Sequence, residues 1–103
     1  MRWYAYVAYF FGGVFLVNAI PHSVSGVLGR AFPSPFSSPP GQGATALVNV
    51  LWGTFNLVVG YLLVSRVGTF DLRRTREVLV VGAGGLLMAV MLAQLFGPLY
   101  GGA

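Results

Sequence analysis

The amino-acid sequence predicts an all-α membrane protein with three transmembrane helices. Three apolar stretches, Trp3–Ile20, Ala44–Val64 and Val78–Phe96, contain no charged residue. A helix of about 20 residues rises ~30 Å, which matches the hydrocarbon thickness of a bilayer. The chain has 103 residues, of which 56% are hydrophobic and 8% charged, whereas a soluble domain of this size needs more charge on its large surface. We therefore expect one transmembrane domain over residues 1–103.

The first span, residues 3–20, is followed by a proline. Pro21 lacks a backbone N–H, so we expect it either to kink the helix or to end it, with an outer loop over residues 21–43. Arg2 and the small-residue pattern around Val17-Asn18-Ala19 also fit a cleaved secretory signal. The stretch is long for a signal and rich in aromatic residues, which favours a retained span.

Residues 31–43 of the outer loop contain four prolines, which exclude helix and favour polyproline II. Phe32 and Phe36 make this segment too apolar for a flexible tether. We expect an ordered strap that folds back over the outer mouth of the bundle, with its Phe rings in the interface. The alternatives are a rigid connector and a docking surface for an extracytoplasmic partner.

The second span, residues 44–64, and the third span, residues 78–96, are joined by a basic loop over residues 65–77. This loop carries Arg66, Arg73, Arg74 and Arg76. The positive-inside rule places it in the cytoplasm, so the N-terminus is cytoplasmic and the C-terminus extracytoplasmic. All six basic residues are Arg, which suggests a GC-rich bacterial genome and the inner membrane. The cluster either sets topology alone or also binds acidic lipid headgroups or an acidic partner.

Capping and charge patterns suggest how the third helix begins. Thr69 and Asp71 are candidate N-caps, so the helix would begin before the third span. Arg73 and Glu77 are then spaced i, i+4 on its surface and would form an ion pair.

Small residues recur at four-residue steps in every span, which favours close helix contact in lipid. The first span offers Ala8 and Gly12, the second offers Asn49 with Gly53 and Asn56 with Gly60, and the third offers Gly85, Ala89 and Ala93. We expect these faces to pack within the chain, with copies of itself, or with other membrane helices. The bilayer is the remaining partner, and the lack of a basic stripe with interleaved aromatics argues against nucleic acid.

A candidate polar cluster lies near the outer ends of the first two spans. It comprises Asn18, His22, Asn49, Trp52 and Asn56. We expect Asn49 near the depth of Asn18, and Asn56 about 10 Å deeper from seven residues of helical rise. A carboxamide without a partner in lipid costs several kcal/mol, so these groups should form an interhelical hydrogen-bond clamp.

The cluster could instead be a binding site. An imidazole at this depth could relay protons, touch a quinone headgroup or ligate haem, although a single His cannot supply both ligands of a bis-His haem. No carboxylate accompanies His22 in sequence and the chain has no Cys, so we expect no metal site and no other cofactor. No acid is available to orient His22 toward Ser23 or Ser25, so we name no catalytic residue.

Several strings of this sequence resemble a group of short bacterial integral membrane proteins that carry an Asn-Gly-Ile-Pro-His motif and a Pro-rich loop. In this chain Ala19 replaces the Gly of that motif. The resemblance implies a membrane location and no particular activity. The matching strings are Asn18-Ala19-Ile20-Pro21-His22, Pro33-Ser34-Pro35-Phe36-Ser37-Ser38-Pro39-Pro40-Gly41, Asn49-Val50-Leu51-Trp52-Gly53-Thr54-Phe55-Asn56 and Gly60-Tyr61.

These observations favour a small non-enzymatic membrane subunit or scaffold, which assembles with itself or with a larger complex. One alternative is a transporter or channel protomer, in which Asn49 and Asn56 line a path between chains. The other is an electron-transfer component that uses His22 to contact quinone or haem.

Overall fold

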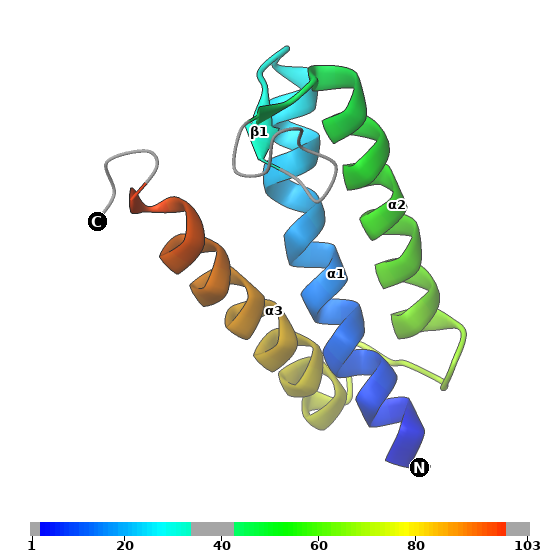
Figure 1. Cartoon of the computed structure of the whole chain (residues 1–103). Helices are drawn as coiled ribbons and strands as arrows, with labels where there is room; N and C mark the ends of the chain where they lie inside the picture. The colour runs from blue at the N-terminus through cyan, green and yellow to red at the C-terminus, as the bar shows by residue number, and fades with distance from the viewer. Residues whose placement is uncertain (1–2, 34–42, 99–103) are drawn as a thin grey trace.

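The computed structural model describes residues 3–33 and 43–98 and is built from helices. These are α1 (Trp3–Val27), α2 (Ala46–Ser65) and α3 (Thr75–Phe96), and two short strands, β1 (Phe32–Pro33) and β2 (Gly43–Ala44), lie between α1 and α2 (Figure 1). All three helices are long and apolar enough to cross a membrane. The predicted all-α membrane fold with three transmembrane helices is therefore confirmed.

The first helix is longer than the sequence predicts. α1 runs through Pro21 to Val27, so the loop begins about two turns after the predicted start at residue 21. Proline removes a single backbone donor. α1 also packs on α2 on both sides of it, at Gly12 and at Gly26, which keeps the helix continuous. The helix ends where Gly29 adopts a φ of 72°, a conformation that favours glycine.

The connection from α1 to α2 is closed by a short strand pair. β1 and β2 are antiparallel, with Phe32 opposite Ala44 and Pro33 opposite Gly43. Thr45 then caps α2, because its Oγ1 accepts a hydrogen bond from the N–H of Val48 at 3.2 Å. Residues 34–42, which hold most of the expected Pro-rich strap, lie outside the described residues, and the strap stays a prediction.

α3 begins before the third span, as predicted, but not at either predicted cap. α3 begins at Thr75, and neither Thr69 nor Asp71 caps it. Asp71 Oδ1 instead accepts a hydrogen bond from the N–H of Arg73, which organises the turn before the helix. The expected Arg73–Glu77 pair is also wrong because Arg73 precedes the helix, and Glu77 pairs with Arg74 at 2.9 Å.

Glu77 is buried, with 2% of its surface exposed, and it fastens the loop over residues 66–74. Its Oε1 accepts a hydrogen bond from the N–H of Asp71, and its Oε2 accepts one from Arg74, which also donates to the carbonyl oxygen of Thr69. This pairing raises the pKa of Arg74 above its usual value, so the guanidinium stays charged. A carboxylate can be buried here because both of its oxygens are bonded.

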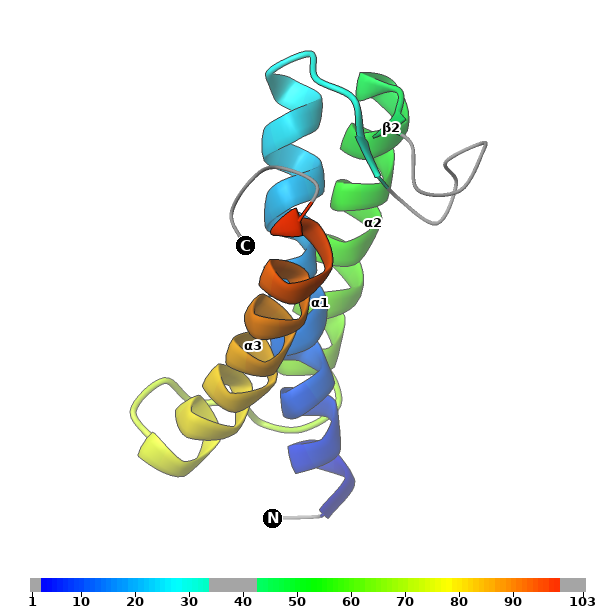
Figure 2. The same cartoon turned by 60° about the vertical axis from the view of Figure 1, so that its left-hand side comes forward.

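The central helix of the bundle is α1. Both α2 and α3 pack on α1 rather than on each other, and α3 crosses α1 at an angle (Figure 2). The first turn of α1 and residues 66–74 lie at one end, which we call the arginine end (Figure 1). β1, β2 and the last turn of α3 lie at the other end, which we call the strand end, and α3 diverges from α1 toward it.

Small residues mediate the helix contacts, as predicted for the first two spans. Ala8 and Gly12 of α1 are buried, and Asn49, Gly53, Asn56 and Gly60 form the buried face of α2. In α3, Gly85 is buried within the chain, whereas Ala89 and Ala93 are exposed, so their expected contact with another helix stays a prediction. The buried face of α3 passes through Gly84 and Gly85 instead, because its crossing angle takes the later turns away from α1.

Candidate functional site

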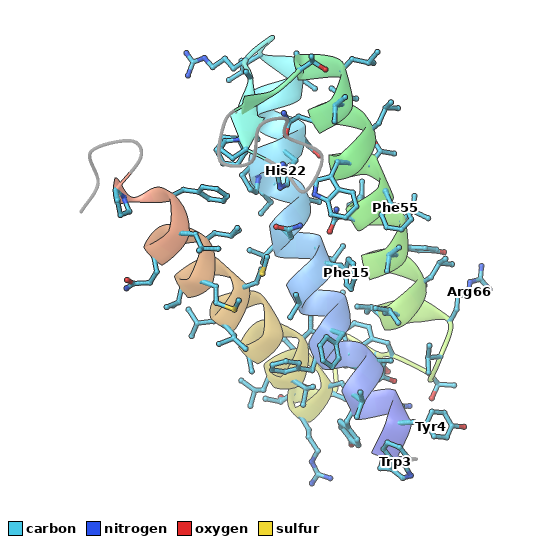
Figure 3. The ribbon with its side chains drawn as sticks, viewed as in Figure 1. Trp3, Tyr4, Phe15, His22, Phe55 and Arg66 are labelled. Carbon is cyan, nitrogen blue, oxygen red and sulfur yellow. The ribbon has the colours of Figure 1, made fainter. Side chains whose placement is uncertain are left out.

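Two side-chain hydrogen bonds join α1 to α2 in the half of the bundle nearest the strand end. Asn18 Nδ2 donates to Asn56 Oδ1 at 2.9 Å, and His22 Nδ1 bonds to Asn49 Oδ1 at 2.8 Å. Asn49 and Asn56 are 0% and 1% exposed, so each amide is enclosed between the helices. Figure 3 shows His22 on α1 beside α2, far from Trp3 and Tyr4 at the opposite end.

The pairing differs in register from the prediction. Asn49 was expected at the depth of Asn18, but it meets His22, and Asn18 meets Asn56. The two helices are antiparallel, so the residue nearest the strand end on α1 pairs with the residue nearest that end on α2. Because α1 continues past Pro21, His22 lies within the helix, one turn further toward the strand end than Asn18.

The amide of Asn49 has a defined orientation. Its Nδ2 donates to the carbonyl oxygens of Phe32 at 3.0 Å and Thr45 at 3.1 Å, which uses both of its N–H groups. Oδ1 therefore faces the imidazole and can only accept. We assign the proton of the neutral His22 ring to Nδ1, which leaves Nε2 with a lone pair.

Aromatic rings cover the imidazole. Phe32 meets His22 edge-on with ring centroids 5.3 Å apart, and Trp52 does so at 6.4 Å. Phe32 also contacts Phe96 of α3 at 4.8 Å, and Trp52 stacks on Phe55 at 5.6 Å. The strand β1 thereby connects His22 to the last turn of α3.

A groove of about 300 Å³ opens between α2 and α3 above the polar pair on α1. Its floor is formed by Asn18 and His22, and His22 is only 3% exposed. The other described residues of the lining are apolar or aromatic and come from β1, α2 and α3. These residues are Pro33, Trp52, Met88, Leu92, Leu95 and Phe96.

The arrangement combines a clamp with a small polar floor in an apolar groove. Asp71 and Glu77 lie at the arginine end, and within residues 3–33 and 43–98 no three His, Cys, Asp or Glu side chains come together. The side chains at the floor can donate and accept hydrogen bonds. This is the chemistry of binding an uncharged polar group in an apolar setting.

All five predicted members of the polar cluster lie together in the structure. The four amide and imidazole side chains form two bonded pairs, and the ring of Trp52 contacts that of His22. The four predicted arginines, Arg66, Arg73, Arg74 and Arg76, are exposed at the arginine end, and Arg74 also binds Glu77. Sequence reasoning expected the ring of Phe32 in the membrane interface rather than against His22, and it did not find Phe96 or the wall from Met88 and Leu92. Only the position of Phe32 in a loop next to the polar spans could have indicated a covering role.

No family model, curated protein or solved structure matches this chain. The resemblance to short bacterial membrane proteins with the Asn-(Gly/Ala)-Ile-Pro-His motif therefore stays a prediction. The geometry of the chain itself carries the functional argument.

Proposed function

We propose that this protein is a non-enzymatic integral membrane subunit that assembles with further copies of itself. The observation that carries the proposal is a second groove, of about 420 Å³, between α1 and α3. Four small residues, Gly13, Gly82, Gly85 and Ala89, line it together with Leu16, Val17, Val81 and Leu86. In lipid, helices associate where small residues allow their backbones to approach closely.

The burial of α3 supports this proposal. In the most apolar 18-residue stretch of α3, only 11% of the residues are buried within the chain, compared with 33% in the corresponding stretch of α1. Gly82 has no neighbouring atom where a Cβ would stand, and Ala89 is exposed. A helix from a second copy would cover this small-residue face, which the chain leaves open.

The polar cluster does not favour the channel alternative. A path between chains would need Asn49 and Asn56 to face away from their own bundle. Both amides are buried against α1 and bonded to Asn18 and His22. Their contacts support an internal clamp.

We further propose that the arginine end faces the cytoplasm of a bacterial cell. Arg66, Arg73, Arg74 and Arg76 gather at that end, and the first turn of α1 lies beside them. The strand end then faces outward, as the positive-inside rule requires.

Native mass spectrometry from nanodiscs tests the assembly. We expect the wild-type protein to give multiples of its 11.0 kDa chain. Ala89→Leu fills the groove and should weaken assembly about tenfold, since overpacking a contact typically costs ~1–3 kcal/mol. Ala83→Leu is the matched control, because Ala83 is exposed on α3 but does not line the groove.

A wild-type chain that stays monomeric at every protein-to-lipid ratio would contradict the proposal. Equal assembly of the Ala89→Leu and Ala83→Leu variants would show that the oligomer uses another face.

A further inference from the structure

His22 has one ring nitrogen that the fold leaves unused. Nδ1 is bonded to Asn49, whereas no group within residues 3–33 and 43–98 hydrogen-bonds to Nε2. The two nitrogens lie on different edges of the ring, so Nε2 points away from the amide of Asn49. Nε2 is not among the fully enclosed side-chain atoms that lack a partner in the described part of the chain, so its edge of the ring keeps a small accessible surface. In an apolar environment such an acceptor favours a ligand that donates a hydrogen bond.

His22 lines the groove between α2 and α3, and we place Nε2 on the edge of its ring that borders this groove. His22 is 3% exposed, and the groove is lined by its side chain. Asn18 lies one turn away on the same floor and uses only one of its amide N–H groups, on Asn56. Its second N–H and its Oδ1 bond to no other described residue. The floor thus offers an acceptor and a donor one helical turn apart.

These groups select a ligand by its chemistry. A hydroxyl group can donate to Nε2 of His22 and accept from the amide of Asn18 at once. An ether or a carbonyl can only accept, so it leaves Nε2 unpaired. The aromatic side chains of Trp52 and Phe96 in the walls suit a planar ring, and Met88 and Leu92 suit an alkyl chain that leads into the lipid.

We infer that this groove binds a lipid-soluble phenol or hydroquinone, whose hydroxyl donates a hydrogen bond to Nε2 of His22. The volume of about 300 Å³ is at the lower end for small-molecule sites and accommodates one ring. The inference is independent of the oligomeric role, because the two grooves share no residue among those that the structure describes.

Nitrogen-15 NMR measures the protonation and hydrogen bonding of both ring nitrogens of His22. The chain contains a single His, so histidine labelling gives one imidazole spin system in nanodiscs. We expect 2-decylhydroquinone to move the Nε2 resonance saturably while the Nδ1–H resonance is retained. Its 1,4-dimethyl ether and the corresponding benzoquinone lack the donor and should bind about tenfold more weakly, the usual effect of an unmade buried hydrogen bond.

The three compounds share a ring and an alkyl chain, and their affinities are compared at equal concentration in the lipid so that differences in partition do not contribute. Equal, non-saturating shifts for all three would overturn the inference. A free ring whose proton resides on Nε2 would overturn it as well, because that nitrogen could then not accept.

A pair of variants tests the groove without altering the clamp. Leu92→Trp fills the groove and should weaken hydroquinone binding by about tenfold or more, as expected for a blocked pocket. Leu87→Trp introduces the same side chain at an exposed position of α3 outside the groove and should bind as wild type does. Wild-type binding by Leu92→Trp would place the ligand elsewhere and overturn the assignment.

Discussion

The side chain of Asn49 shows how this chain satisfies polar groups in an apolar environment. Its amide donates to two carbonyl oxygens, of Phe32 and Thr45, and its oxygen accepts from His22. One residue thereby joins β1, the residue that caps α2, and His22 of α1. Replacing it would leave the Nδ1–H of His22 and the carbonyl oxygen of Phe32 without these bonds.

The clamp predicts which pairs of residues are energetically coupled. We expect Asn18→Leu and Asn56→Leu to show a coupling free energy of ~0.6–2 kcal/mol, the range for interhelical hydrogen bonds. Asn18→Leu and Asn49→Leu should be nearly additive, because those two side chains belong to different pairs. Reversible unfolding in mixed micelles measures both double-mutant cycles. A larger coupling for Asn18 with Asn49 would show that the helices pair in another register.

At the scale of the helices, glycine contacts determine how closely α3 approaches α1. A Cβ at Gly84 would collide with the carbonyl oxygen of Phe10, and one at Gly13 would collide with that of Val81. The backbones therefore meet directly in the arginine half of the bundle. Toward the strand end the helices separate, and side chains of Met88 and Leu92 line the groove.

Two glycines of α3 provide a matched test of this contact. Gly84→Ala should destabilise the bundle by ~1–3 kcal/mol, because the collision is with backbone and cannot be relieved by a side-chain rotation. In detergent that keeps the chain monomeric, Gly82→Ala should be neutral or stabilising by up to ~1 kcal/mol, because its Cβ meets open space within the chain and alanine favours helix. The free energy of unfolding of each variant, measured by chemical denaturation, compares the two positions. Equal destabilisation would mean that α3 is rotated about its axis.

Sequence reasoning predicted the number and approximate places of the helices but not all of their ends. Span length and apolar composition identify a membrane helix strongly, as the three helices confirm. The continuation of α1 past Pro21 depends on its packing against α2, which a local proline rule does not include. The start of α3 was misjudged because Asp71 caps a turn rather than the helix.

The candidate site was predictable in its polar members and not in its apolar ones. Asn18, His22, Asn49 and Asn56 were conspicuous because polar side chains in a span require partners. Phe96 and Leu92 look like ordinary lipid-facing residues in the sequence. Their role depends on the crossing angle of α3, which arises from contacts at Gly84 and Gly85.

At the scale of the whole molecule, the two ends differ in charge and this predicts a topology. Leu72 near the arginine end and Leu28 near the strand end are 79% and 59% exposed, and the chain has no natural cysteine. We expect a membrane-impermeant maleimide to label Leu28→Cys in intact spheroplasts and to label Leu72→Cys only after lysis. The reverse pattern would mean that the arginine end faces outward.

The dependence of α2 and α3 on α1 also has a consequence for biosynthesis. Ribosomes make α1 first, so its amide and imidazole enter the membrane before α2 exists to meet them. The 38 residues from Leu28 to Ser65 take roughly 2–8 s to translate at ~5–20 residues per second. For that interval we expect the nascent chain to keep Asn18 and His22 in contact with water, the insertion machinery or headgroups, and lateral release into the bilayer to follow the arrival of the second helix.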